Sequence, residues 1–104
     1  MTPTSPTRRF RHLAVHCKLD PYDVYCGRGR DPRTGAANPG WGNPFVIGRD
    51  GDRDTVIAKH RAWLLAQPDL VARARRELRN KVLSCWCAPK ACHCETLAEV
   101  ANSG

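Results

Sequence analysis

The segment CWCAPKACHC, residues 85–94, gathers cysteine and histidine, the residue types that most often bind metals or act as nucleophiles. Thiolate sulfur and imidazole nitrogen are ligands that Zn²⁺ prefers, and a structural zinc site takes four ligands in a tetrahedron. Here the ligands can be Cys87, Cys92, His93 and either Cys85 or Cys94. The spacing C-x-C-x4-C-H-C differs from the paired C-x2-C knuckle of common zinc sites. A metal site is therefore one of three interpretations.

The two other interpretations need no metal. Cysteine behaves as a small buried hydrophobe, so the motif can be part of the core. Alternatively, Cys92 is a reactive thiolate, with His93 or Glu95 as the acid or base. All three interpretations stay open at the level of the sequence.

The strand that carries the motif determines which of its side chains lie together. Residues 81–87, KVLSCWC, form an almost continuous apolar run, which is typical of a buried central strand. Alternate residues of a strand share a face, so we expect Cys85 and Cys87 to project together and Trp86 to the opposite side.

A turn and a helix follow this strand. Pro89 turns the chain, and residues 92–101 predict a short terminal helix with Leu97 and Val100 facing inward. In α/β proteins, ligands bind at the carboxyl ends of the strands. A helix N-terminus at that edge attracts anions and lowers the pKa of a thiol.

The rest of the chain predicts a small α/β domain. Further strands are expected at residues 13–17 and 23–26, and helices are expected to start after Asp52 or Asp54 and at Pro68. The order favours one sheet of about three strands with helices packed on it, in a strand-helix-helix-strand-helix core. Strands 24–27 and 81–87 are expected to be parallel neighbours joined by a right-handed helical crossover.

The domain boundaries follow from composition. Residues 1–12 lack apolar periodicity, and we expect them to form a disordered basic tail. Residues 13–104 are expected to form a single α/β domain, because 104 residues suffice for one modest core. His16 and His60 fall on apolar stripes and are expected to pack at the edge of that core.

The chain is basic, with a net charge of +7. This charge predicts an anionic partner such as a nucleotide or nucleic acid. Part of the charge comes from arginines that are expected to be solvated on the wet face of the second helix, namely Arg73, Arg75, Arg76 and Arg79. The absence of an apolar leader and the six cysteines favour a cytoplasmic protein with no membrane partner. Richness in Ala, Arg, Asp, Gly and Pro points to an actinobacterium or one of its phages.

Two glycine-containing blocks offer ligand-binding residues. In GRGR, Gly27 permits a tight turn, and Arg28 and Arg30 are able to clamp a phosphate or carboxylate. In WGNPF, Trp41 and Asn43 are candidates for the wall of a pocket. The alternatives are a simple turn with solvated arginines and a capped turn anchored in the core. If both blocks converge on the Cys-His turn, they form a nucleotide-type pocket.

Three blocks of the sequence resemble the small family catalogued as domain of unknown function 4326, which is common in bacteria and phages. The blocks are Val24-Tyr25-x-Gly27-Arg28, Trp41-Gly42-Asn43-Pro44-Phe45 and Cys85-Trp86-Cys87-x-Pro89-x-x-Cys92-His93. The resemblance spans roughly residues 13–100 and implies a shared site, but it brings no established activity.

This chain also departs from the family pattern. Residues 29–40 form a long insertion, and Cys26 and Cys94 stand where the pattern suggests other residue types. The resemblance therefore implies that the functional residues, and the ligands of any metal, are Cys85, Cys87, Cys92 and His93.

These observations lead to one expected function and two alternatives. The leading prediction is a domain that binds an anionic ligand, nucleotide or nucleic acid, at a Cys/His-rich strand-to-helix turn ordered by Zn²⁺. The first alternative is a small enzyme that acts on a nucleotide or nucleic acid through Cys92 and His93. The second is a phage-type protein that binds a host protein.

Overall fold

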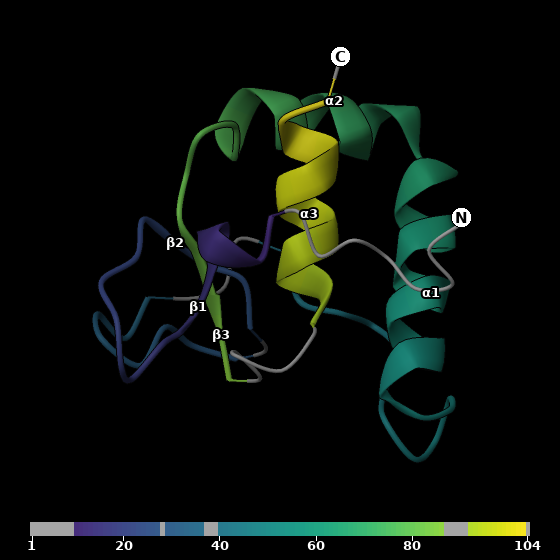
Figure 1. The fold of residues 1–104 in the computed structure, drawn as a ribbon, viewed down its shortest axis with the longest axis horizontal. Helices are drawn as coiled ribbons and strands as arrows, with labels where there is room; N and C mark the ends of the chain where they lie inside the picture. Colours follow the sequence, from purple (N-terminus) through teal and green to yellow (C-terminus); the bar gives the residue numbers. More distant parts are fainter. Residues whose placement is uncertain (1–9, 28, 37–39, 87–91, 104) are drawn as a thin grey trace, which may run out of the picture.

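The computed structural model describes residues 10–27, 29–36, 40–86 and 92–103. The elements are η1 (Arg11–Leu13), β1 (Ala14–His16), β2 (Val24–Tyr25), α1 (Arg53–Leu65), α2 (Pro68–Glu77), β3 (Leu83–Cys85) and α3 (His93–Ala101). They form one parallel sheet, with α3 packed on the sheet and α1 and α2 packed on α3 (Figure 1). The predicted α/β class is confirmed.

The sheet has the order β1-β3-β2, and both outer strands run parallel to β3. Ala14 and Val24 flank Leu83 on its two sides. The predicted parallel pairing of the second and third strands is therefore confirmed, with α1 and α2 in the crossover. All three residues of β3 are buried, as expected for a central strand covered on both sides.

The strands are shorter than the apolar runs that predicted them. Residues 13–17 contribute a strand of three residues, and residues 81–87 contribute another strand of three. Strand pairing continues only as long as the neighbouring strands supply backbone hydrogen-bond partners. The pairing of β1 with β3 ends where Cys17 N–H donates to Cys85 O at 2.9 Å. Trp86 follows the last strand residue, and Cys87 lies outside the described residues.

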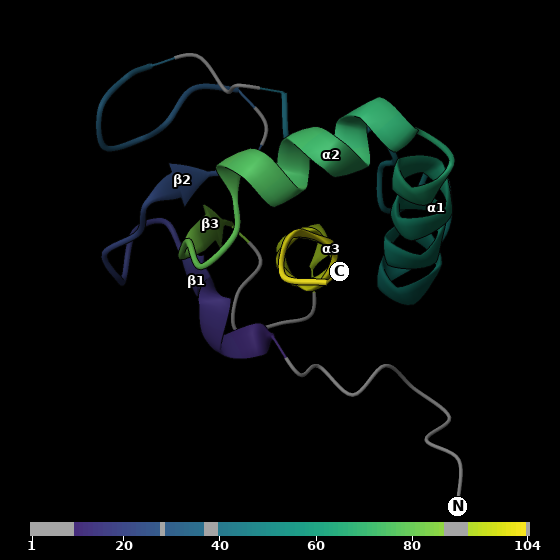
Figure 2. The same cartoon turned by 90° about the horizontal axis from the view of Figure 1, so that it is seen from above.

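Helix α3 occupies the centre of the domain. It lies between the sheet on one side and α1 and α2 on the other (Figures 1 and 2). Its inward residues, Leu97, Ala98 and Ala101, are fully buried, and Val100 is buried beside them. The predicted inward face of the terminal helix is therefore confirmed.

The two crossover helices begin where the sequence predicts. Asp52 caps α1, because its side chain accepts a hydrogen bond from Thr55 N–H at 2.8 Å. Pro68 is the first residue of α2 and needs no intrahelical acceptor for a backbone N–H. Leu64 and Leu78 bury the inner faces of the two helices in the core.

A second, smaller apolar cluster lies on the other face of the sheet. It contains Cys17, Tyr22 and Tyr25. The loop at residues 29–36 packs onto it, because the Arg33 guanidinium lies 4.0 Å from the Tyr22 ring centroid and the Tyr22 hydroxyl donates to Asp31. Both faces of β3 are therefore covered, one by α3 and one by a loop.

The described fold starts before residue 13. Phe10 packs against the main core cluster, and its carbonyl accepts a hydrogen bond from Leu13 N–H at 2.9 Å. The predicted tail of residues 1–12 thus includes residues that belong to the folded domain. None of the helices in the described part of the chain is long and apolar enough to cross a membrane.

The packing of Phe10 predicts a measurable contribution to stability. Phe10→Ala should lower the melting temperature by roughly 5 °C, because a partly buried phenylalanine contributes about 1 kcal/mol. The control is a chain that lacks residues 1–9, for which we expect a shift of no more than a degree or two, as measured by circular dichroism. Equal losses in both proteins would contradict a domain boundary at Phe10.

Candidate functional site

A cavity of about 340 Å³ lies where β2 and β3 end and α3 begins. Its polar lining comes from Gly27, Asn43, Arg53, Cys85, Cys92 and His93. Its apolar lining comes from the loop at residues 45–47, the first turns of α1 and Trp86. Gly27 of the GRGR block and Asn43 of the WGNPF block both line this cavity with Cys92 and His93.

The topology explains the position of this cavity. Parallel strands end together at one edge of a sheet, and the chain must leave that edge before it enters the next helix. Cys92 is the N-cap of α3, and His93 is its first residue. The N-terminal N–H groups of α3 therefore give this end of the cavity a positive potential.

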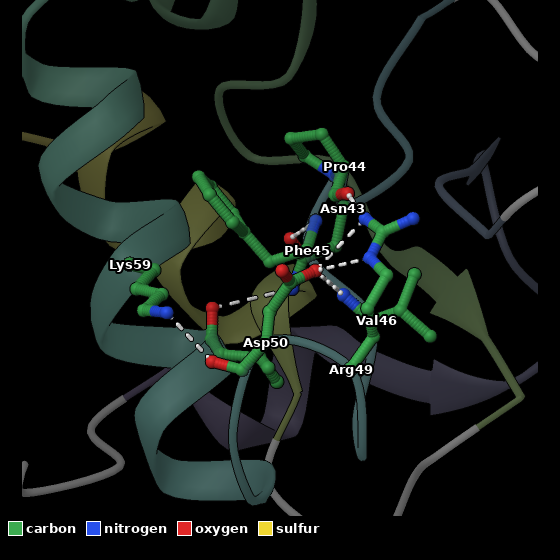
Figure 3. Close-up of polar contacts among 8 residues, drawn as sticks. Asn43, Pro44, Phe45, Val46, Arg49, Asp50 and Lys59 are labelled. Carbon is green, nitrogen blue, oxygen red and sulfur yellow. Dashed lines mark hydrogen bonds and ion pairs between the residues drawn. The ribbon is translucent and has the colours of Figure 1, made fainter.

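Residues 43–50, which begin in the WGNPF block, form a rim of the cavity beside α1 (Figure 3). The Asn43 Oδ1 accepts a hydrogen bond from Phe45 N–H at 2.9 Å, which is the capped turn expected before Pro44. The Asp50 carboxylate accepts from the Arg49 guanidinium at 2.8 Å and from a backbone N–H of the rim, and these bonds lower the pKa of Asp50. The rim is therefore held by its own polar contacts before any ligand binds.

Trp41 supports the rim from the core and does not line the cavity. Its side chain is buried, and the Arg73 guanidinium lies 4.4 Å from its ring centroid. The Trp41 carbonyl accepts a hydrogen bond from the ring of His93. Trp41 thus positions the site through its backbone.

His93 links three segments of the site. Its Nε2 lies 2.7 Å from Cys26 O and 2.9 Å from Trp41 O. Both partners are acceptors, so Nε2 carries the hydrogen and donates it. His93 thereby ties the end of β2 and the WGNPF block to the start of α3, and this nitrogen is committed to structure.

Three buried thiols form a cluster beside the cavity. The sulfur atoms of Cys85, Cys92 and Cys94 all lie within 4.8 Å of one another, and Cys85 Sγ and Cys92 Sγ are 3.0 Å apart. Burial raises the pKa of the Cys94 thiol well above its usual value, and hydrogen bonds of its protonated form with the neighbouring thiols raise it further. These three cysteines could hold a metal ion.

The cluster differs in part from the predicted metal set. Cys85 and Cys92 belong to both, whereas Cys94 replaces His93 among the described ligand atoms that lie together. Cys87, the remaining predicted ligand, lies outside the described residues. The sequence offered Cys94 only as an alternative to Cys85, and the family resemblance implied a set without it.

Of the two predicted ligand-binding arginines, Arg30 is not among the described residues that line the cavity. Arg30 donates to Gly35 O at 3.0 Å within its own loop, and Arg28 lies outside the described residues. The cavity instead takes its cation from Arg53, the first residue of α1. Only the cap at Asp52 indicated that a helix starts there, and nothing in the sequence marked this arginine as a lining residue.

The arginine face of α2 is partly structural. Arg73 covers Trp41 and pairs with Glu77 at 2.9 Å. Arg79 donates to Ala101 O at 3.0 Å and to Ser103 O at 2.9 Å. These two hydrogen bonds satisfy backbone carbonyls at the end of α3. Arg75 is exposed on the same helix. Part of the basic charge therefore serves the fold.

His60 packs behind the site as a neutral imidazole. It is 1% exposed, and its ring centroid lies 5.1 Å from that of His93. Its Nδ1 has no hydrogen-bond partner among the described residues. Burial, assisted by the charge of His93, lowers the pKa of His60 to about 3. A core position for His60 agrees with the prediction.

Taken together, the fold and the site define a small parallel α/β domain with a thiol-lined cavity at the carboxyl edge of its sheet. The chain belongs to the family described as Domain of unknown function (DUF4326), whose model matches residues 11–103. This match confirms the resemblance of the three sequence blocks. No curated protein and no solved structure shows significant similarity to the chain.

The buried His60 predicts a stability that decreases in mild acid. Its pKa is about 3 in the folded protein and takes the ordinary value of 6.5 when unfolded. The unfolded chain binds more protons between these values, so the free energy of unfolding falls as the pH drops from 6.5 toward 3. We expect His60 to contribute a slope of about 1.4 kcal/mol per pH unit below its unfolded pKa, measured by urea denaturation.

Two variants isolate this contribution. His60→Gln and His60→Leu should both flatten the pH dependence, because neither side chain titrates. His12→Gln is the control, since His12 is exposed at the start of the fold. A slope that is unchanged in both His60 variants would exclude His60 as the source.

Proposed function

We propose that this domain binds a small anionic ligand that carries a phosphate, such as a nucleotide, in the cavity at the carboxyl edge of the sheet. The cavity itself is the observation that carries the proposal. It places the Arg53 side chain and the N-terminus of α3 around one half-open pocket. Both features favour negative charge.

The remaining lining supports a ligand with an apolar part. Phe45, Ile47 and Trp86 form an apolar and partly aromatic wall. The volume of about 340 Å³ lies at the lower end of the range for small-molecule sites, roughly 300–1,000 Å³. A nucleotide combines a flat base with an anionic group, and both parts have complementary surfaces in this cavity.

We favour a small ligand over nucleic acid. Nucleic-acid binding draws its affinity from arginine and lysine side chains that contact many phosphates. The sequence placed Arg73 and Arg79 on a wet basic face. In the structure, Arg73 stacks on Trp41, and Arg79 donates a hydrogen bond to the backbone carbonyl of Ala101. A pocket of about 340 Å³ also has room for one phosphate group rather than for a long polyanion.

We further propose that Zn²⁺ binds the thiol cluster and orders the strand-to-helix turn. Cys85 ends β3, whereas Cys92 and Cys94 lie at the start of α3. One ion held by these sulfurs joins the two elements that frame the cavity. Soft thiolate ligands favour Zn²⁺ over the hard cations Mg²⁺ and Ca²⁺.

Catalysis through Cys92 and His93 and the binding of a host protein stay predictions from the sequence. The Nε2–H of His93 donates to two carbonyls, so this nitrogen does not serve as a base toward Cys92. We also propose a cytoplasmic location, in an actinobacterium or in the host of a phage.

Removal of the cavity cation tests the proposed ligand class. Arg53→Gln should weaken binding of AMP or GMP at least about tenfold, because it deletes a charge-assisted contact. Arg75→Gln makes the same change in charge on the exposed face of α2 and should leave affinity unchanged. Isothermal titration with nucleotides, ribose 5-phosphate and inorganic phosphate measures both variants.

Two results would contradict the small-ligand proposal. One is equal affinity in the Arg53 and Arg75 variants. The other is binding of single-stranded or duplex DNA or RNA with a steep salt dependence, in the absence of any response to the small phosphates.

Metal removal tests the zinc proposal. Protein purified without added metal should contain about one zinc ion per chain, and chelation should lower its melting temperature by at least about 10 °C. Cys94→Ser should abolish zinc retention, whereas Cys17→Ser should not, because Cys17 is buried on the other face of the sheet. Metal-free protein whose stability does not respond to added zinc would contradict the proposal.

A further inference from the structure

We propose that Cys26 is the fourth sulfur ligand of the metal site, which then consists of Cys26, Cys85, Cys92 and Cys94. This inference rests on the proposed binding of zinc and adds a ligand from β2. The site then joins the ends of two neighbouring strands to the start of α3.

The register of the sheet places Cys26 beside Cys85. Tyr25 pairs with Ser84, and Cys26 N–H donates to Ser84 O at 2.8 Å. The next lateral pair is therefore Cys26 and Cys85. Residues that lie side by side in a sheet project to the same face, and here both belong to the core cluster that α3 covers.

Cys94 connects the Cys26 thiol to the thiols of Cys85 and Cys92. Its thiol donates to Ser84 O at 3.5 Å, and the same carbonyl accepts from Cys26 N–H. The Cys94 thiol is in hydrogen-bond contact with the thiols of Cys26, Cys85 and Cys92. Cys94 is thus a neighbour of each of the other three thiols.

Coordination through the fourth sulfur requires the Cys26 side chain to rotate toward the cluster. The Cys26 sulfur is outside the group whose members all lie within 4.8 Å of one another. Its contact with Val24 O is 4.0 Å long, so rotation of the thiol away from this carbonyl has little cost.

The alternatives for a fourth ligand are weaker. His93 uses Nε2 to bond the carbonyls of Cys26 and Trp41. Cys17 lies on the opposite face of the sheet with Tyr22. A water ligand suits an exposed metal, whereas Cys26 is completely buried.

The chemistry of four thiols is consistent with this site. Each thiol releases its proton to solvent when it binds, so one Zn²⁺ and four thiolates leave a net charge of −2. The N-terminus of α3 favours negative charge near Cys92, because Cys92 is the N-cap of the helix.

Replacement by Co²⁺ counts the sulfur ligands. In reduced protein, the sulfur-to-cobalt charge-transfer absorption scales with the number of thiolates. Cys26→Ser and Cys26→Ala should lose about a quarter of its intensity, and the affinity for zinc should fall at least about tenfold. Cys17→Ser is the matched control and should keep the full spectrum.

Two further measurements make the test independent of the folding of the Cys26 variants. X-ray absorption of the wild-type zinc protein should give four sulfur neighbours at about 2.3 Å. Cys87→Ser should leave the cobalt spectrum and the zinc affinity unchanged, although Cys87 belongs to the same motif.

The outcomes separate this inference from the zinc proposal. Three sulfur neighbours with one nitrogen or oxygen would overturn the role of Cys26 and leave zinc binding intact. Loss of the fourth sulfur in Cys87→Ser, with an unchanged spectrum in the Cys26 variants, would do the same. A wild-type protein that binds neither zinc nor cobalt would overturn both proposals.

Discussion

The site depends on one constraint, which is that β3 pairs in parallel on both sides with strands of only two or three residues. Because all three strands run in the same direction, they end at the same edge of the sheet. Cys17 and Cys26 each extend the ladder by one hydrogen bond at that edge, to Cys85 O and Ser84 O. The cavity, the thiol cluster and the start of α3 all follow from this common end.

The local signals in the sequence were sufficient for the fold. The run KVLSCWC identified the central strand, Asp52 identified the start of α1, and Pro68 identified the start of α2. Each of these signals acts over a few residues, through burial, capping or a fixed backbone angle. Strand lengths could not be predicted in the same way, because they depend on how long the neighbouring strands supply hydrogen-bond partners.

The site was predictable only in part, for a related reason. Cys85 and Cys92 could be placed together because they flank one turn, whereas Arg53 reaches the cavity from a helix 32 residues earlier than Cys85 in the chain. His93 has the residue type of a metal ligand, yet two backbone carbonyls from distant segments hold its Nε2. Such long-range hydrogen bonds leave no local pattern in a single sequence.

The central position of α3 also constrains how the protein folds during synthesis. Residues 93–101 fill the space between the sheet and the two crossover helices, so the earlier segments have no complete core before this helix leaves the ribosome (Figure 2). Until then, the apolar faces of α1 and α2 and the edges of the short strands stay exposed to solvent and to other chains. The domain therefore folds late, through contacts between distant parts of the sequence, and nascent chains that stall before residue 93 are the species most prone to aggregation.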